Sequence, residues 1–183
     1  MKGVIFNLLE QIVTDELGAS TWDALLEKSK LEGAYTSLGS YSDNDLFKIV
    51  GAAAEALGKA PQEIVRWAGI KALPLLALRY PHFFIAHKTT RSFVLTLNDI
   101  IHPEVRKLYP GADVPEFGFD TTDPTVLKMS YNSARKMCAF AEGLIIGSAT
   151  HFGERAVIHQ SNCMHRGDAE CLFEIRTMAG GTP

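Results

Sequence analysis

The sequence lacks the features that mark membrane, secreted and nucleic-acid-binding proteins. Its apolar runs are too short and too interrupted to span a bilayer, which needs about 20 residues. Asn7, Glu10 and Gln11 interrupt the N-terminal apolar run and no small-residue cleavage site follows, so we expect no signal peptide. The net charge is only −3 and the basic residues are scattered, which argues against a nucleic-acid-binding surface. We therefore expect a cytoplasmic protein with no membrane or nucleic-acid partner.

Two further absences narrow the possible functions. The chain has three cysteines, an odd and small number, so a framework of disulfides is not expected. It has no glycine-rich phosphate loop, so it carries no kinase or cyclase motif of its own. We expect a protein that is not an enzyme.

The spacing of apolar residues predicts one α+β domain of 183 residues, with helices first and strands later. An N-terminal helical subdomain is followed by a four-stranded antiparallel sheet with a helix packed on it. Helices are predicted over 2–18, 20–29 (capped by Ser20 or Thr21), 44–58 (capped by Ser42 or Asp43), 61–80, 81–88, 92–110 and 137–152. Strands are predicted in 111–125, over 126–135, 155–163 and 170–177, with a frayed tail over 178–183.

The stretch "VLKMSYNSARKMC" alternates in a way that is typical of a strand. Its first face is apolar and then carries Tyr131, Ser133 and Arg135, while the other face has two lysines and looks solvated. A buried guanidinium is costly unless it pairs with an anion. Three donors along roughly 13 Å of strand suit an extended anion such as a pair of carboxylates. The alternative is that Arg135 pairs with an Asp or Glu of the chain itself.

His102 lies in the helical stretch "NDIIHPEV", directly before Pro103, where we expect a local bend. A neutral imidazole with no second protein ligand nearby suits an axial ligand of haem, because the porphyrin supplies the other four nitrogens. A core or surface histidine is the alternative. The chain has no Cys-x-x-Cys-His, so covalent c-type attachment is excluded.

Together with the upstream His102, "YNSAR" resembles the Tyr-x-Ser-x-Arg motif of the haem nitric oxide/oxygen-binding (H-NOX) family, the sensor modules related to the haem domain of soluble guanylate cyclase. The resemblance covers nearly the whole chain, including "MKGVIFNLLE" and "YPGADVPEF". It implies haem b between two lobes, with His102 as axial ligand and with Tyr131, Ser133 and Arg135 on the propionates. It also implies that Pro115 presses on the porphyrin. Residues 1–183 would form a single H-NOX sensor domain.

The resemblance also implies which residues surround the bound gas. Oxygen-binding members have a distal tyrosine where this chain has Phe140, which offers no hydrogen-bond donor. The other residues expected around the ligand are apolar: Ile5, Leu9, Pro74, Leu78 and Leu144. Bound dioxygen carries partial negative charge and needs a donor, whereas nitric oxide does not. We therefore expect binding of nitric oxide and carbon monoxide, and poor binding of dioxygen, although plain core packing would explain each apolar residue equally well.

The three cysteines form the pattern C-x24-C-x7-C, in Cys138, Cys163 and Cys171. Three thiols and an imidazole make a tetrahedral zinc set, and free buried thiols are the alternative. Some bacterial H-NOX proteins resemble this chain here and hold a structural zinc with three cysteines and one histidine. In the match that histidine falls about where Gln160 stands, so we predict His159 as the fourth ligand, with His165 as the fallback. The thiols could also serve as a redox switch if zinc is lost.

The family implies a two-state mechanism, in which loss of the iron–His102 bond lets the porphyrin relax against Pro115 and the lobes shift. A partner would read that shift, and the usual bacterial partner is a histidine kinase or a cyclic-di-GMP-metabolising enzyme. Two other functions remain open. One is a zinc-stabilised module without haem that binds a small organic acid at Arg135. The other is a thiol enzyme that uses a cysteine with His151, His159 or His165, for which the sequence fixes no base or oxyanion hole.

Overall fold

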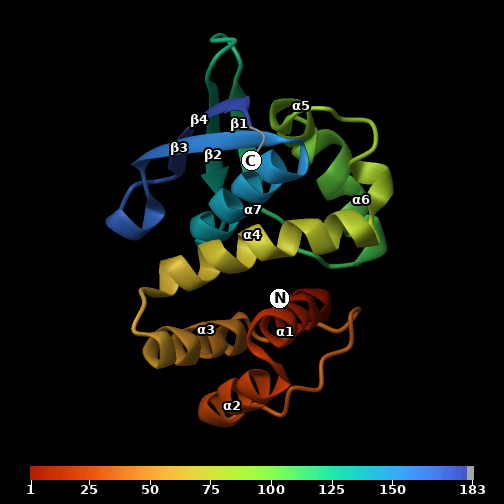
Figure 1. Ribbon diagram of the computed structural model, residues 1–183, viewed down its shortest axis with the longest axis vertical. Coiled ribbons are helices and arrows are strands. Elements are labelled where there is room, and N and C mark those ends of the chain that lie inside the picture. The colour runs from red at the N-terminus through yellow and green to blue at the C-terminus, as the bar shows by residue number, and fades with distance from the viewer. Residues whose placement is uncertain (181–183) are drawn as a thin grey trace.

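The structure is a computed structural model that describes residues 1–180, and it has two lobes (Figure 1). The first lobe is purely helical and contains α1, α2 and α3. The second contains a four-stranded sheet, and α4 and α7 lie between this sheet and the first lobe. The helices are α1 (Gly3–Leu17), α2 (Ala19–Ser29), α3 (Asp43–Leu57), α4 (Pro61–Arg79), α5 (Thr90–Val94), α6 (His102–Leu108) and α7 (Cys138–His151). The strands are β1 (Glu116–Asp120), β2 (Leu127–Asn132), β3 (Glu154–Asn162) and β4 (Cys171–Ala179).

Local signals set most of the helix ends. Gly18 ends α1 with a positive φ of 92°, and its N–H donates to the Thr14 carbonyl. The Ser42 hydroxyl caps α3 by accepting a hydrogen bond from the Asn44 N–H at 3.2 Å. Pro61 occupies the first turn of α4, where a missing N–H costs little.

The predicted cap of α2 is wrong. Gly18 is the N-cap of α2 as well as the C-cap of α1, so Ser20 and Thr21 lie inside the first turn. The Thr21 hydroxyl instead donates to the Leu17 carbonyl at 2.8 Å. The two helices share one glycine, and no residue is left between them to act as a separate cap.

The helical stretch predicted over 92–110 is broken into three pieces. After α5, residues Leu97–Ile101 form a π-helical turn, and α6 then begins at His102. Pro103 lies in the first turn of α6, where no intrahelical partner is lost. The irregularity expected beside His102 is therefore present, and it precedes the histidine. The preceding segment, predicted as a short helix over 81–88, is a single 3₁₀ turn at Pro81–Phe83.

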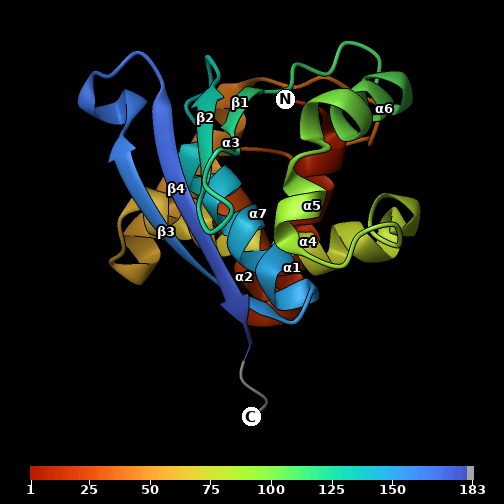
Figure 2. The same ribbon diagram turned by 90° about the horizontal axis from the view of Figure 1, so that it is seen from above.

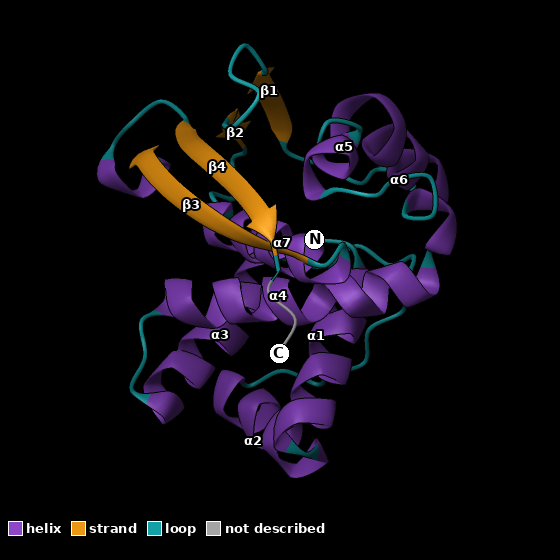
Figure 3. Cartoon of the chain, turned by 45° about the horizontal axis from the view of Figure 1, so that its top comes forward, coloured by secondary structure: helices purple, strands orange, loops and turns teal. Residues whose placement is uncertain are grey.

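The sheet is antiparallel throughout, with the order β1-β2-β4-β3, which confirms the predicted α+β class. Figures 2 and 3 show α7 in the middle of this lobe, with β3 on one side of it and α5 and α6 on the other. Alternation along β2 buries Leu127, Met129 and Tyr131, as predicted for this face.

The ends of two predicted strands need correction. β2 stops at Asn132, which is the last residue that pairs with β1, so Ser133 and Arg135 lie in the turn that follows. β4 continues to Ala179, which places Met178 in a strand instead of a frayed tail. Residues 181–183 of that tail lie outside the described residues. Within residues 1–180, no helix is both long and apolar enough to cross a membrane.

Candidate functional site

A cavity of about 430 Å³ lies between the helical lobe and the sheet lobe. Its walls are almost entirely apolar, and they come from α1, α4, α5, α6, α7 and the first two strands. Many of the site residues predicted from the sequence line it: Ile5, His102, Pro115, Tyr131, Ser133, Arg135, Phe140 and Leu144. Segments that are far apart in the chain therefore meet at one apolar space.

His102 stands on the cavity wall at the first residue of α6. Its ring stacks on Phe117 of β1, with ring centroids 5.6 Å apart. Burial lowers the pKa of His102 to about 4, the positive charge of Arg106 adds to this, and the Pro115 backbone acts in the opposite direction. The imidazole is therefore neutral near pH 7, with a nitrogen lone pair available to a metal ion.

Arg135 is paired with carboxylates of the chain, which is the alternative that the sequence left open. Its Nε donates to Asp43 Oδ2 at 2.8 Å, and its Nη1 donates to Asp113 Oδ2 at 2.8 Å. Asp43 also binds the N-terminal ammonium of Met1. The Asp113 side chain is 66% exposed, so this half of the ion pair can give way to another anion at little cost.

Tyr131 and Ser133 hold the turn that carries Arg135. The buried Tyr131 hydroxyl accepts a hydrogen bond from the Met137 N–H at 3.0 Å, and burial raises its pKa. The Ser133 hydroxyl accepts from the Arg135 N–H at 3.3 Å. Both hydroxyl groups still carry a proton to donate, so the rim of the cavity offers two hydroxyls and a guanidinium to an anion.

Three predicted pocket residues do not line the cavity. Pro74 and Leu78 are one turn apart on the outer face of α4, and Leu78 is 80% exposed. Leu9 is buried in the core of the helical lobe instead. The inner face of α4 belongs to Leu73 and Leu76.

Tyr80 and Tyr109 also line the cavity and were not predicted from the sequence. Their hydroxyls hydrogen-bond to each other and so link the end of α4 to the end of α6. Burial, together with this bond, raises the pKa of Tyr109 to about 12. No short motif marks these two tyrosines, but the spacing 73, 76 and 80 would have placed Tyr80 on one face of α4 with Leu73 and Leu76.

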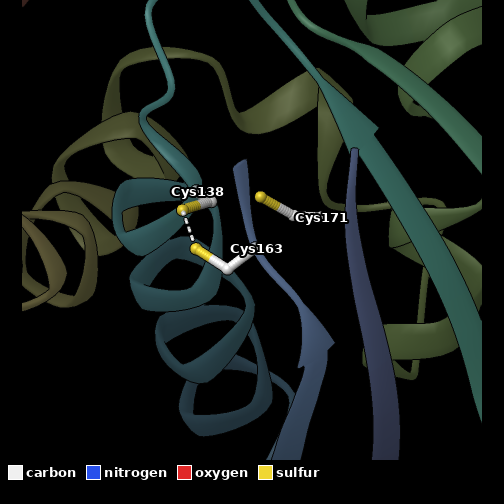
Figure 4. A group of neighbouring side chains, drawn as sticks. All are labelled: Cys138, Cys163 and Cys171. Carbon is white, nitrogen blue, oxygen red and sulfur yellow. Dashed lines mark hydrogen bonds between the residues drawn. The ribbon is translucent and has the colours of Figure 1, made fainter. Parts of the chain in front are cut away.

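The three cysteines form a cluster apart from the cavity residues, at the N-terminal end of α7 (Figure 4). Their sulfur atoms all lie within 4.8 Å of one another, and Cys138 Sγ is 3.9 Å from Cys163 Sγ. All three side chains are buried, and burial raises the pKa of Cys138 to about 12. The convergence of three thiols from α7, β4 and the loop after β3 provides three soft ligands for one metal ion.

Neither predicted histidine joins this cluster. His159 is exposed on the outer face of β3, opposite Glu174 of β4. His165 is also exposed, and its Nε2 lies 2.7 Å from the Lys136 carbonyl oxygen. His159 is turned away from the thiols, because it lies on the face of β3 opposite to that of Gln160. The residue that β3 turns toward them is Gln160.

An apolar cavity with one neutral imidazole on its wall and cationic and hydroxyl groups at its rim fits a particular kind of ligand. Such a ligand is flat and largely apolar, has a metal that accepts one nitrogen, and carries carboxylates at one edge. Haem has these properties, so the fold and the site together are those of a haem-binding domain.

The sequence model of the haem-NO-binding family matches residues 2–160, and the chain belongs to this family, the H-NOX proteins. An H-NOX protein of Shewanella oneidensis, solved in the Fe(II)NO state, is 35% identical, with 97% of this chain and 99% of that one covered and a TM-score of 0.92. One from Shewanella woodyi, solved in the Fe(II)CO state, is 32% identical (100% and 97%; TM-score 0.83). A mutant from K. algicida, in the Fe(II) unliganded state, is 28% identical (97% and 97%; TM-score 0.87). No curated protein gives a significant match.

Proposed function

We propose that residues 1–183 form one sensor domain that binds nitric oxide and carbon monoxide at ferrous haem b, binds dioxygen poorly, and signals to a partner protein. The observation that carries this proposal is that one cavity brings His102, the "YNSAR" turn and Phe140 together. The similar H-NOX proteins described above, solved with nitric oxide or carbon monoxide, support the choice of gases.

Each part of the cavity has a distinct task in this proposal. His102 is the axial ligand, because its low pKa keeps the imidazole neutral and free to bind iron. Arg135 turns from the exposed Asp113 carboxylate to a propionate, while Tyr131 and Ser133 donate from beside it. When bound, the haem supplies a ferrous iron with one position open to a diatomic gas.

The gas selectivity follows from the groups that face that open position. Phe140, Ile5 and Leu144 line the cavity and carry no polar hydrogen. Tyr80 and Tyr109, whose hydroxyls hydrogen-bond to each other, and Tyr131 at the rim line the cavity elsewhere. A ligand that needs a hydrogen-bond donor at the position of Phe140 finds none there, whereas nitric oxide binds without one.

The proposed signal is a relative movement of the two lobes. The cavity is lined by α1 of the helical lobe and by β1, β2 and α7 of the sheet lobe, so a change at His102 reaches both. A partner that binds one arrangement better than the other reads the state of the site. We propose a histidine kinase or a cyclic-di-GMP-metabolising enzyme as that partner, with the domain itself acting as a sensor and not as an enzyme.

We also propose that Cys138, Cys163 and Cys171 bind a structural zinc ion. Support comes from the convergence of the three sulfur atoms in a buried place. Zinc there would join α7 to β4 and to the loop after β3, and its binding free energy would add to the stability of this lobe.

The test of the haem proposal is the absorption spectrum of the purified protein, expressed with haem supplied. We expect a Soret band that shifts on addition of nitric oxide or carbon monoxide, and no stable oxygenated spectrum in air. A colourless protein would instead favour a module that binds a small organic acid at Arg135. His102→Gly should lose or loosen the haem, and His165→Ala, an exposed histidine outside the cavity, should retain it. An unchanged spectrum in His102→Gly would mean that the ligand is misassigned.

A further inference from the structure

Gln160 lies on the same side of the sheet as the three cysteines. In β3 it pairs with Phe173 of β4, whose side chain is buried. Its neighbour His159 pairs with Glu174, on the opposite face of the sheet. The register shifts between Gln160 and Asn162, so one extra residue enters the strand there. In a regular strand, residues 160 and 163 would point to opposite faces, and the bulge brings Gln160 and Cys163 to the same face.

The side-chain amide of Gln160 has no ordinary hydrogen-bond partner. Its Nε2 is buried and finds no acceptor among the described residues. An unpartnered buried amide destabilises the fold, so its presence needs an explanation. The same amide lies beside the Cys138 thiol. It is a side-chain donor at the cluster with no other acceptor, and it would act beside the Met164 N–H, which already donates to Cys171 Sγ at 3.3 Å.

We propose that Gln160 completes the metal site as a hydrogen-bond donor to the sulfur ligands, so that the metal is held by three thiolates and no imidazole. The inference rests on the proposed binding of zinc at these cysteines. On binding, the three thiols release three protons, and three thiolates around a divalent ion leave one net negative charge. An N–H group aimed at a thiolate stabilises that excess charge, whereas His159 lies on the other face of β3 and His165 contacts the Lys136 carbonyl.

This donor set has a consequence for metal selection. Sulfur-only ligation favours soft and borderline cations such as Zn²⁺ over oxygen-preferring ones. Because a neutral imidazole ligand is missing, zinc binding should be weaker than at a site that has it. Gln160→His places an imidazole at the position where β3 points into the cluster, and should therefore strengthen zinc binding.

The test is a zinc titration of the metal-free protein against a chromophoric chelator. Gln160→Ala should lower the zinc affinity by about 10–100-fold, the usual effect of removing a partner of a metal ligand. Cys163→Ser should lower it further. His159→Ala and His165→Ala are the matched controls, and both should bind zinc as the unmodified protein does. X-ray absorption of the zinc-loaded protein should show sulfur neighbours at about 2.3 Å and no imidazole, which should appear only in Gln160→His.

The outcomes separate this inference from the zinc proposal. An imidazole signal in the unmodified protein, or a loss of affinity in either histidine variant, would overturn the role of Gln160 while zinc binding stood. An unchanged affinity in Gln160→Ala would overturn it as well. If neither the unmodified protein nor Gln160→His bound zinc more tightly than Cys163→Ser, both the zinc site and the role of Gln160 would be wrong.

Discussion

Asp43 links Arg135 to the start of the chain, and its ionisation should be visible in the stability of the haem-free protein. Burial acts to raise the pKa of Asp43, but the N-terminal ammonium and Arg135 outweigh it, and the pKa is lowered overall. Because the folded-state pKa is below the unfolded value of about 3.9, the ionised group stabilises the fold above that pH. This stabilisation is lost as the pH falls through the folded-state pKa.

We therefore predict that Asp43→Asn lowers the thermal unfolding temperature at pH 7. The difference in unfolding temperature between the variant and the unmodified protein should shrink as the pH falls below about 4. The measurement is unfolding by circular dichroism across that range. Asp23→Asn, which changes an exposed carboxylate of α2, is the control and should follow the unmodified protein. Parallel curves for Asp43→Asn and the unmodified protein down to the lowest pH would contradict the prediction.

The selectivity for gases should depend on one side chain. Phe140→Tyr adds a hydrogen-bond donor at a position of the cavity wall that has none, and it should allow a stable oxygenated spectrum in air. Phe117→Tyr is the matched control: Phe117 also lines the cavity, but it stacks on His102 and so lies on the other side of the proposed haem. If the two variants gave the same spectrum in air, the position of the added hydroxyl would not matter, and Phe140 would not decide the gas selectivity.

Single residues were predictable where strand alternation applied and unpredictable where a helix is apolar on several faces. Tyr131 follows from alternation, because it shares a face with Leu127 and Met129. Leu78 does not follow from its pattern, because α4 has apolar residues on both the inner and the outer side. His159 could not be rejected in this way, because regular alternation places residues 159 and 163 on the same face, and only the bulge after Gln160 reverses this.

At the scale of elements, α4 and α7 approach so closely that only glycine fits between them. A Cβ atom at Gly143 of α7 would lie 2.2 Å from the Arg66 carbonyl oxygen of α4, and one at Gly69 would lie 2.5 Å from the Phe140 carbonyl oxygen. Gly143→Ala should therefore force the helices apart and destabilise the protein by about 1–3 kcal/mol, measured by urea unfolding.

The chain offers a matched control for this prediction. Gly51 lies in the interior of α3, and a Cβ atom there meets nothing within 4 Å. Gly51→Ala should stabilise the protein by roughly 0.5–1 kcal/mol, because alanine is the better helix former. Opposite signs for the two substitutions are expected. A neutral Gly143→Ala would mean that the two helices can separate freely.

The elements whose ends depend on local signals were predicted well, and those whose ends depend on partners were not. Gly18, Ser42 and Pro61 act within one turn, so the ends they set were visible in the sequence. The end of β2 at Asn132 depends on its pairing with Glu116, and the bulge after Gln160 depends on its pairing with β4. Pairing of distant segments leaves no local trace, so the fourth ligand position could not be located from spacing alone.

At the scale of the whole molecule, the cavity itself could not be derived from composition or periodicity. It exists because Ile5, His102 and Tyr131, which lie far apart in the chain, meet across two lobes. Only the resemblance to a family with haem between its lobes indicated such a meeting. A group bound in this cavity makes apolar contacts with both lobes, and so it should hold the lobes together.

This argument predicts where haem changes the local stability of the molecule. Amide hydrogen exchange should slow most in α1 and α6, because residues of both line the cavity, while α2, which contributes none of the lining residues, should change least. The comparison is between haem-free and haem-loaded protein, with α2 as the internal control. Equal slowing in α1 and α2 would show that haem stabilises the fold only globally. Slowing confined to α6 would show that the helical lobe does not sense the site, and the proposed movement of the lobes would lose its basis.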